Sequence, residues 1–402
     1  MGNRSSRLRE RALATPGRAS VVREELPGSD RQFELHYARM RPSDESTISL
    51  LVIPGGPGLA SLIGYESFRR RAQRRGLDVI MVEHRGVGLS RFTVGGDVLS
   101  REAMRIRLVI DDLATVLDAE NVESAIVVGS SYGSYLAQSF AAAHSDRVDS
   151  LILDSAMFDI GEVDPAVTAV REVLGDVDHP DTTLARLARK IADLADDGEV
   201  PRDVLFTHAR IVYEAAGPEI LDRYINQLHQ GLALGTRRFL ESVSKADFEK
   251  SIPYFFEFDP VGEIAFRELN FAAAGADYRT VGEKFSEFVG APYDLPTHAS
   301  EFAGEVTVIS GERDLRTPRS GAERIVESYP YGRLIPVPDH GHSALDTHSE
   351  VLLTVMDMHA RGLAGELSSS EAAWTSLPRR GGPSRHLPNL IRASLLWDRL
   401  RR

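Results

Sequence analysis

The 402-residue chain contains no cysteine. This absence excludes disulfide bonds, thiolate nucleophiles and metal sites built on cysteine, and it is compatible with a reducing compartment. Lysine is scarce too, because almost all basic residues are arginine, and we attach no chemical role to that bias.

Long apolar runs are also missing. The N-terminal stretch MGNRSSRLRERALATPGRAS is basic but has no apolar core, and no later run is long enough to cross a bilayer. We therefore expect a cytoplasmic protein that does not enter a membrane. The net charge of -12 disfavours nucleic acid as a partner and suits either solubility or a cationic substrate. The chain has no G-x-x-x-x-G-K motif, so we expect no nucleotide, and we expect no cofactor or metal.

The order of the patterns predicts an α/β protein with an insertion. Buried-type strands alternate with helical patterns up to about residue 155, and strands return near residue 306. Between these parts, acidic and alanine-rich helical patterns dominate. We expect a tail over 1–24, a core over 25–158 and 299–362, a helical cap over 159–298, and a C-terminal extension over 363–402.

The C-terminal extension carries a short amphipathic stretch of apolar residues among arginines. Leu390, Ile391, Leu395, Trp397 and Leu400 make up its apolar side. Such a segment can lie on an anionic membrane, but more often it docks on its own domain or on a partner subunit. We favour docking, and the oligomeric state stays open.

The central motif of the chain is SAIVVGSSYGSYLAQ, residues 124–138. Its segment Gly129 to Gly133 fits G-x-S-x-G between an apolar run and a helical pattern. A strand, a tight turn and a helix are the context of a nucleophile elbow, in which the serine hydroxyl is held outward. The sequence therefore predicts Ser131 as a nucleophile.

A serine hydroxyl needs an imidazole to take its proton and a carboxylate to orient that imidazole. Asp314 follows a predicted strand, and His342 follows the last predicted strand, which gives the order serine, acid, histidine. Asp339 is an alternative acid. His340 and His348 are alternative bases, although we expect His348 to lie on the surface of a helix.

Acyl transfer also needs backbone amides that stabilise negative charge on the carbonyl oxygen. The loop Pro54-Gly55-Gly56-Pro57-Gly58 follows a buried strand and is suitably placed. We expect the amides of Gly56 and Tyr132 to form the oxyanion hole.

Four motifs together resemble the proline iminopeptidase and tripeptidyl aminopeptidase group of α/β-hydrolases. They are Gly55-Gly56-Pro57-Gly58, Arg85-Gly86-x-Gly88-x-Ser90, Gly129-x-Ser131-Tyr132-Gly133-Ser134-Tyr135 and Gly311-x-x-Asp314-x-x-x-Pro318. The resemblance covers about residues 45–155 and 300–360, and it implies an α/β-hydrolase fold. The chain departs from the group at Pro54, where the group usually has a histidine.

One segment of the predicted cap, residues 265–271, is similar to the part of proline iminopeptidases that binds the free α-amine of the substrate. The resemblance implies that Glu268 has this role. We read the nearby Glu257, Asp259 and Glu263 as a solvated helix face.

The sequence thus predicts a serine hydrolase that acts on a small peptide, most simply an aminopeptidase releasing N-terminal proline or another residue. The alternative is an esterase, lactonase or amidase that acts on a small molecule. A non-catalytic ligand-binding protein of the same fold is the least favoured hypothesis.

Overall fold

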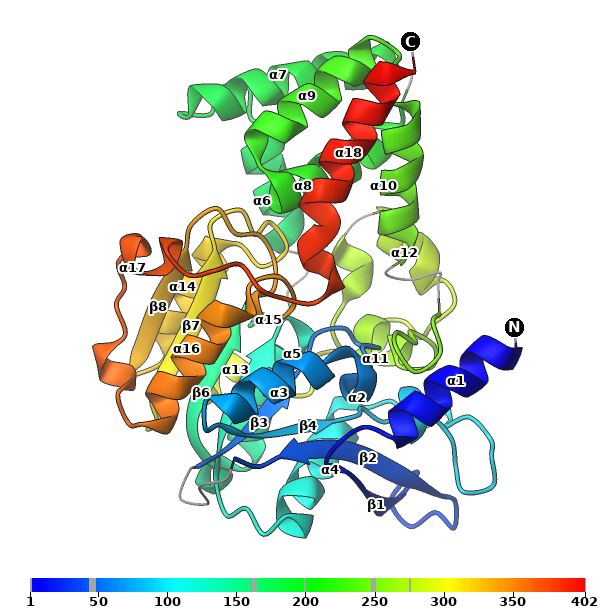
Figure 1. The fold of residues 1–402 in the computed structure, drawn as a ribbon, viewed down its shortest axis with the longest axis vertical. Helices are drawn as coiled ribbons and strands as arrows, with labels where there is room; N and C mark the ends of the chain where they lie inside the picture. The colour runs from blue at the N-terminus through cyan, green and yellow to red at the C-terminus, as the bar shows by residue number, and fades with distance from the viewer. Residues whose placement is uncertain are drawn as a thin grey trace.

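The computed structural model describes residues 2–42, 48–158, 160, 165–198, 200–246, 251–274 and 276–401. Its centre is one eight-stranded sheet (Figure 1). The strands are β1 Arg18–Glu24, β2 Gln32–Met40, β3 Ser49–Ile53, β4 Asp78–Val82, β5 Ala125–Ser130, β6 Val148–Asp154, β7 Val306–Gly311 and β8 Gly332–Val337.

The strand order is β1-β2-β4-β3-β5-β6-β7-β8. The pairs β1–β2 and β2–β4 are antiparallel. The remaining pairs, which run across the sheet from β4 through β3, β5, β6 and β7 to β8, are all parallel. The carboxyl ends of the parallel strands therefore meet at one edge, where ligands of open α/β sheets bind. The predicted fold, a mostly parallel sheet flanked by helices with a helical insertion, is confirmed.

Helices cover both faces of the sheet and bury its apolar side chains. One face packs against α4 Ile106–Ala119, α5 Tyr132–Ala143, α13 Leu295–Ala299 and α14 Arg319–Ser328. The other packs against α3 Glu66–Arg74, α16 Ser349–Ala360 and α17 Glu371–Thr375. The short helices α2 Ser61–Gly64 and α15 Ala344–Thr347 lie in the loops at the carboxyl edge. Because helices cover both faces, the central strands are continuous apolar runs.

The N-terminal segment differs from the tail that we expected over residues 1–24. Its described residues form helix α1 Gly2–Leu13 and strand β1, which pairs with β2 from Arg18 to Glu24. The strand escaped prediction because it is an edge strand with no fully buried side chain. Polar arginines and glutamates can occupy such positions, so the apolar alternation is weak.

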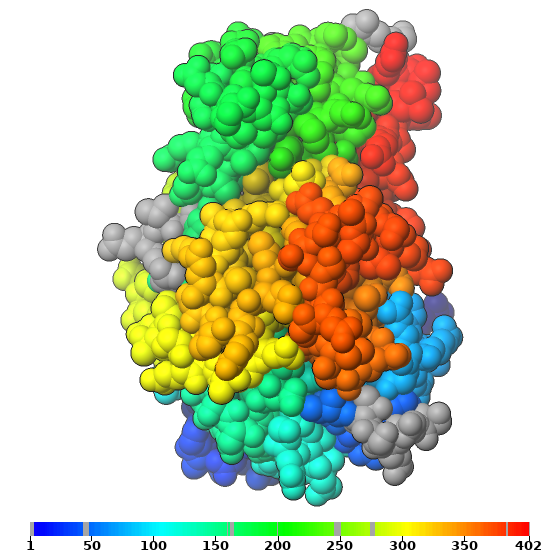
Figure 2. All heavy atoms as spheres, turned by 90° about the vertical axis from the view of Figure 1, so that its left-hand side faces the viewer, coloured from blue at the N-terminus to red at the C-terminus, as the bar shows by residue number. Residues whose placement is uncertain are grey.

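The insertion between β6 and β7 forms two layers above the carboxyl edge (Figures 1 and 2). The upper layer has its own apolar core. It contains α6 Pro165–Gly175, α7 Thr182–Asp197, α8 Arg202–Ala216, α9 Pro218–His229 and α10 Leu234–Ala246. The lower layer contains α11 Gly262–Arg267 and α12 Ala276–Gly282, with a cluster of aromatic rings around Phe258, Phe266 and Phe285.

The C-terminal helix α18, Leu387–Leu400, is part of the upper layer. In Figure 1 it runs upward from the sheet beside α8 and α10, and its Ile391 and Leu395 are buried in the core of that layer. Its Asp398 accepts hydrogen bonds from the backbone amides of Gly235 and Thr236 at the start of α10. The amphipathic stretch therefore docks on its own chain, while Leu390, Trp397 and Leu400 remain exposed.

Among the described residues, no helix is both long enough and apolar enough to span a bilayer.

Candidate active site

Ser131 occupies a sharp turn between β5 and α5. Its φ of 54° lies in a region that residues other than glycine rarely adopt, so the turn is strained. The neighbouring glycines make this turn possible. A Cβ atom on Gly129 would lie 2.2 Å from the carbonyl oxygen of Gly133, and one on Gly133 would lie 2.1 Å from that of Ile53. The predicted elbow is therefore present, and only glycine fits at its two flanking positions.

The structure brings Ser131, His342 and Asp314 into one hydrogen-bonded chain. His342 Nε2 lies 2.9 Å from Ser131 Oγ, and His342 Nδ1 lies 3.1 Å and 3.0 Å from the two carboxylate oxygens of Asp314. Ser131 follows β5, Asp314 follows β7 and His342 follows β8, so all three lie at the carboxyl edge of the sheet. The arrangement can transfer a proton from a serine hydroxyl to an oriented imidazole.

Asp314 is buried and fully hydrogen-bonded. Its carboxylate accepts from the backbone amides of Arg316 and Thr317, from the Thr317 hydroxyl and from His342. Burial alone would raise the pKa of this carboxyl, but the nearby His342 and these hydrogen bonds outweigh it and hold the pKa well below its usual range. Asp314 therefore stays ionised beside the imidazole at neutral pH.

The rival residues lie elsewhere. The side chain of Asp339 is 74% exposed and pairs with Arg313. His340 is buried, and burial lowers its pKa to about 3, so it stays neutral. His348 was expected on a helix surface, which is wrong: it is buried at the junction of α15 and α16, where its ring contacts that of His340.

The loop that carries His342 is held by residues at the end of β6. The carboxylate of Asp154 accepts hydrogen bonds from the amides of Ala344 and Leu345, and the Ser155 hydroxyl accepts from the amide of Ser343. We assigned no role to this pair from the sequence. The sequence could have indicated such a role, because both residues lie at the end of a buried strand and therefore at the carboxyl edge of the sheet, where Ser131 also lies.

The glycine loop after β3 lies against Ser131. A Cβ atom on Gly55 would lie 3.4 Å from the Cβ of Ser131, and Gly56 lines the same cavity. Backbone hydrogen bonds tie this loop to the lower cap layer, from the amide of Glu257 to the carbonyl of Gly58 and from the amide of Ala60 to the carbonyl of Phe255. These bonds brace the loop, in which the side chain of Pro54 can donate no hydrogen bond.

Glu268 does not line the cavity around Ser131. Its carboxylate accepts a hydrogen bond of 2.7 Å from the amide of Ile106, at the start of α4, and lies 3.5 Å from Arg267. This placement differs from the amine-binding position that we expected. Its side chain joins the lower cap layer to the core instead.

The reading of three neighbouring acidic residues as a solvated face holds only for Asp259, whose side chain is 63% exposed. Glu257 is buried and accepts from the amide of Gly88, and Glu263 is buried and pairs with Arg267. Both were therefore misread, because the cap packs this segment onto the core.

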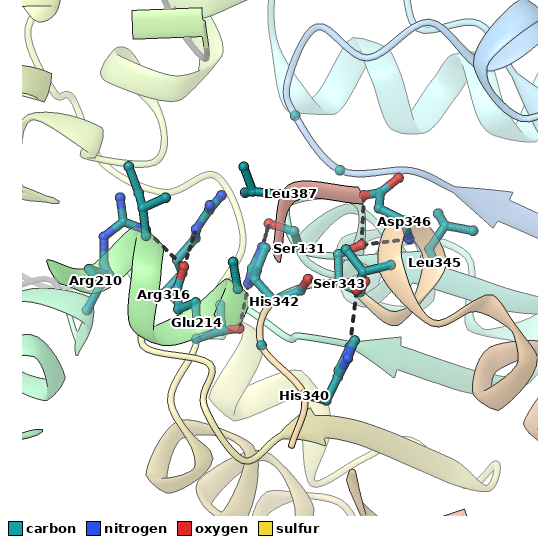
Figure 3. A pocket seen from close by; sticks show the side chains of 18 of the residues that line it. Ser131, Arg210, Glu214, Arg316, His340, His342, Ser343, Leu345, Asp346 and Leu387 are labelled. Atoms are coloured by element: carbon teal, nitrogen blue, oxygen red, sulfur yellow. Dashed lines mark hydrogen bonds and ion pairs between the residues drawn. The ribbon is translucent and has the colours of Figure 1, made fainter. Parts of the chain in front are cut away.

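A cavity of about 1350 Å³ opens above Ser131 and His342. The cap and the C-terminal segment form its far side, where Leu387 is one of the lining residues (Figure 3). Glu214 of α8 reaches this wall, where it pairs with Arg210 and Arg316 and accepts from the amide of Leu315 (Figure 3). Glu214 thus links the cap directly to the loop of Asp314, which sequence patterns did not reveal.

In the described part of the chain, no group of three or more histidine, aspartate or glutamate side chains is arranged to hold a metal ion.

Together, the parallel sheet, the serine elbow and the Ser-His-Asp chain define a serine hydrolase site on an α/β sheet. Residues 48–349 match the family model of the alpha/beta hydrolase fold, and the chain belongs to this family. A comparison with curated protein sequences found no match.

Solved structures with a similar chain path include three bacterial proteins. A serine hydrolase from Cycloclasticus zankles is 12% identical, with 86% of this chain and 99% of that chain covered and a TM-score of 0.49. A proline iminopeptidase from Mycobacterium smegmatis is 18% identical, with 87% and 99% covered and a TM-score of 0.48. The 2-hydroxy-6-oxo-6-phenylhexa-2,4-dienoate hydrolase from Rhodococcus is 15% identical, with 85% and 100% covered and a TM-score of 0.48.

Proposed function

We propose that this protein hydrolyses its substrate through an acyl-enzyme on Ser131. The observation that carries the proposal is the continuous hydrogen-bonded chain from Ser131 through His342 to Asp314 on the wall of a large cavity. His342 takes the proton of the serine hydroxyl as the oxygen attacks the carbonyl carbon, and then gives it to the leaving group. Asp314 holds the imidazole in the tautomer whose Nε2 can accept that proton.

Water completes the reaction by attacking the acyl-enzyme, with His342 as the base. The negative charge that forms on the carbonyl oxygen at both steps needs backbone donors. We assign this role to the amides of Gly56 and Tyr132, since Gly56 lines the cavity and Tyr132 is the first residue of α5.

The finer proposal is an aminopeptidase that acts on short peptides. It rests on the four motifs that resemble the proline iminopeptidase group. The cap over the site is compatible with it, because a covered cavity admits the end of a peptide more readily than the middle of a folded chain. Proline is the first N-terminal residue to test.

A second candidate is a hydrolase of small-molecule esters. It is favoured by the position of Glu268, whose carboxylate lies outside the cavity and already holds the amide of Ile106. A peptidase would then need another group to bind the α-amine.

The test of the reaction class is labelling with a fluorophosphonate probe, which modifies activated serines. We expect the purified protein to be labelled and the Ser131→Ala variant to remain unlabelled. The Ser145→Ala variant, at an exposed serine just after α5, is the control and should still react. A folded wild-type protein that takes up no label would contradict the catalytic proposal and leave a ligand-binding protein.

The test of the substrate class is a parallel screen of aminoacyl arylamides and acyl esters. Turnover of prolyl or other aminoacyl arylamides, lost in the Ser131→Ala variant, would support the aminopeptidase. Turnover confined to esters would support the second candidate and reject the first.

A further inference from the structure

The cavity above Ser131 is lined by a marked excess of positive charge. Among the described lining residues are eight arginines and five acidic residues, although the whole chain has a net charge of -12. The arginines are Arg71, Arg210, Arg313, Arg316, Arg324, Arg379, Arg385 and Arg392. This local charge is therefore opposite in sign to that of the protein.

Three of these arginines are ion-paired, although two of them share one carboxylate. Arg210 and Arg316 pair with Glu214, and Arg313 pairs with Asp339. Within the described ranges, the other five make no ion pair, although Arg385 donates to the ring of His386 and Arg392 donates to the side-chain oxygen of Asn389. Arg71 donates to the Ser349 hydroxyl, while its Nε is buried and has no hydrogen-bond partner there.

Three of the five unpaired arginines come from the C-terminal segment. Arg379 precedes a tight anchor, in which the amide of Ser349 donates to the carbonyl of Arg380 and the amide of Gly382 donates to the carbonyl of Asp346. Arg385 lies just before α18, and Arg392 lies on its second turn. Helix α18 is itself packed into the cap. The segment that carries these arginines is therefore attached at two places, by the anchor at Arg380 and Gly382 and by α18.

Two of the lining arginines, Arg71 and Arg313, also lie within electrostatic reach of other arginines. Burial lowers the pKa of the Arg71 guanidinium, and Arg380 and Arg385 lower it further, while Glu350 opposes them. Burial likewise lowers the pKa of Arg313, and Arg379 adds to the effect against Asp339. Mutual repulsion of this kind is relieved when an anion binds between the cations.

We propose that Arg379, Arg385 and Arg392 of the C-terminal segment, together with Arg71 and Arg324, form an anion-binding subsite that selects acyl substrates bearing a carboxylate or phosphate group. A guanidinium presents paired donors that match either group. This inference rests on the proposed hydrolysis at Ser131, and it specifies in addition that the substrate is negatively charged. A peptide with a free C-terminal carboxylate would satisfy it, as would the half-ester of a dicarboxylic acid.

The kinetic test compares two series of 4-nitrophenyl esters. One series carries a terminal carboxylate (the mono-esters of succinic, glutaric and adipic acid), and the other carries a methyl group in its place. We expect kcat/KM of the wild-type protein to be higher for at least one acid than for its neutral counterpart. The triple variant Arg379→Gln, Arg385→Gln, Arg392→Gln should lose at least about tenfold on that acid, mainly through KM, because a charge-assisted hydrogen bond is worth about 1.5–3 kcal/mol.

The matched control is Arg399→Ala, also an arginine of α18, which does not line the cavity. It should keep the wild-type preference for the acid. The three replaced residues are exposed, so the triple variant should fold, and its thermal unfolding temperature checks this. Equal kcat/KM for both series in the wild-type protein, or an equal loss on both series in the variant, would overturn the proposal.

A binding measurement keeps this test separate from that of the hydrolase. Calorimetric titration of the Ser131→Ala variant with glutarate and with inorganic phosphate needs no turnover. We expect one of the two anions to bind, and the binding to be lost when the three arginines are also replaced. If the wild-type protein takes up no fluorophosphonate label but an anion still binds in this way, the catalytic proposal fails and the subsite stands. If neither anion binds, the subsite is rejected.

Discussion

Asp154 holds the loop of His342 by accepting a 2.9 Å hydrogen bond from the backbone amide of Ala344, two residues after that histidine. A second bond from the amide of Leu345 and a third from the Ser130 hydroxyl complete its shell. Burial raises the pKa of this carboxyl, while the three hydrogen bonds oppose the shift. Asp154 therefore positions the imidazole without touching it.

We expect Asp154→Asn to lower kcat by about ten- to hundredfold with little change in KM, because small displacements of a catalytic group carry such costs. The loss is expected because both carboxylate oxygens of Asp154 accept hydrogen bonds, whereas the side-chain amide of asparagine has only one accepting oxygen. Asp149→Asn, at an exposed position of the same strand, is the control and should behave as the wild type. Unchanged kcat in a folded Asp154→Asn protein would show that the loop is held by other contacts.

Replacing the orienting acid should be far more severe. We expect Asp314→Asn to reduce kcat by about three to four orders of magnitude, as loss of the correct imidazole tautomer does in serine hydrolases. Asp339→Asn should change kcat by less than about twofold, because this side chain is exposed at the rim of the cavity and its ion pair with Arg313 is weakened by solvent. Steady-state kinetics with one ester substrate checks both. The reverse order of effects would make Asp339 the acid.

The depressed pKa of Asp314 also predicts how stability changes with pH. An unfolded aspartate titrates near pH 4, whereas the folded carboxyl stays ionised to lower pH. Its stabilising contribution is therefore complete above about pH 5 and is lost as the pH falls toward the folded pKa. We expect the free energy of unfolding to fall less steeply from pH 5 to pH 3 in Asp314→Asn than in the wild type. Urea unfolding across this range is the measurement, and parallel curves would contradict the assignment.

Glu268 offers a direct test of its structural position. Because its carboxylate holds the start of α4 rather than lining the cavity, we expect Glu268→Gln to change arylamide and ester turnover by the same factor, within about twofold. Kinetics with both substrate types in one protein preparation gives the ratio. A loss restricted to aminoacyl arylamides would restore the amine-binding role that the family resemblance implied.

The elbow predicts a strong position dependence for glycine substitutions. Gly133→Ala would place a Cβ atom 2.1 Å from the carbonyl oxygen of Ile53 and should destabilise the protein by about 1–3 kcal/mol or more. Gly321→Ala, in helix α14 with open space around the new atom, should be neutral or stabilising by up to about 1 kcal/mol. Thermal unfolding of the two variants is the comparison. A Gly133→Ala protein as stable as the wild type would mean that β3 and α5 can move apart.

The hydrogen-bonded chain of Ser131, His342 and Asp314 could be predicted from sequence because each member follows a buried strand, and the fold fixes where such strands end. The order of Ser131, Asp314 and His342 along the chain, and their positions in loops that follow strands, were enough to predict them. Glu268 could not be placed in this way, since its direction depends on how the cap packs on α4. The docking position of α18 could not be predicted in detail either. Its apolar side packs against residues of the cap that are distant in sequence, and local sequence patterns do not indicate such contacts.

The anchoring of α18 limits how the cap can move. A cap joined to the catalytic domain only by its two covalent connections could swing as a hinged lid. Here a third attachment exists, because the chain returns from the domain at Gly382 and ends inside the cap. This attachment adds to the hydrogen bonds that join the lower cap layer to the core, so a simple hinge rotation of the cap would have to break contacts at several separate places. Helix α18 is therefore one of the elements that fix the position of the cap over Ser131.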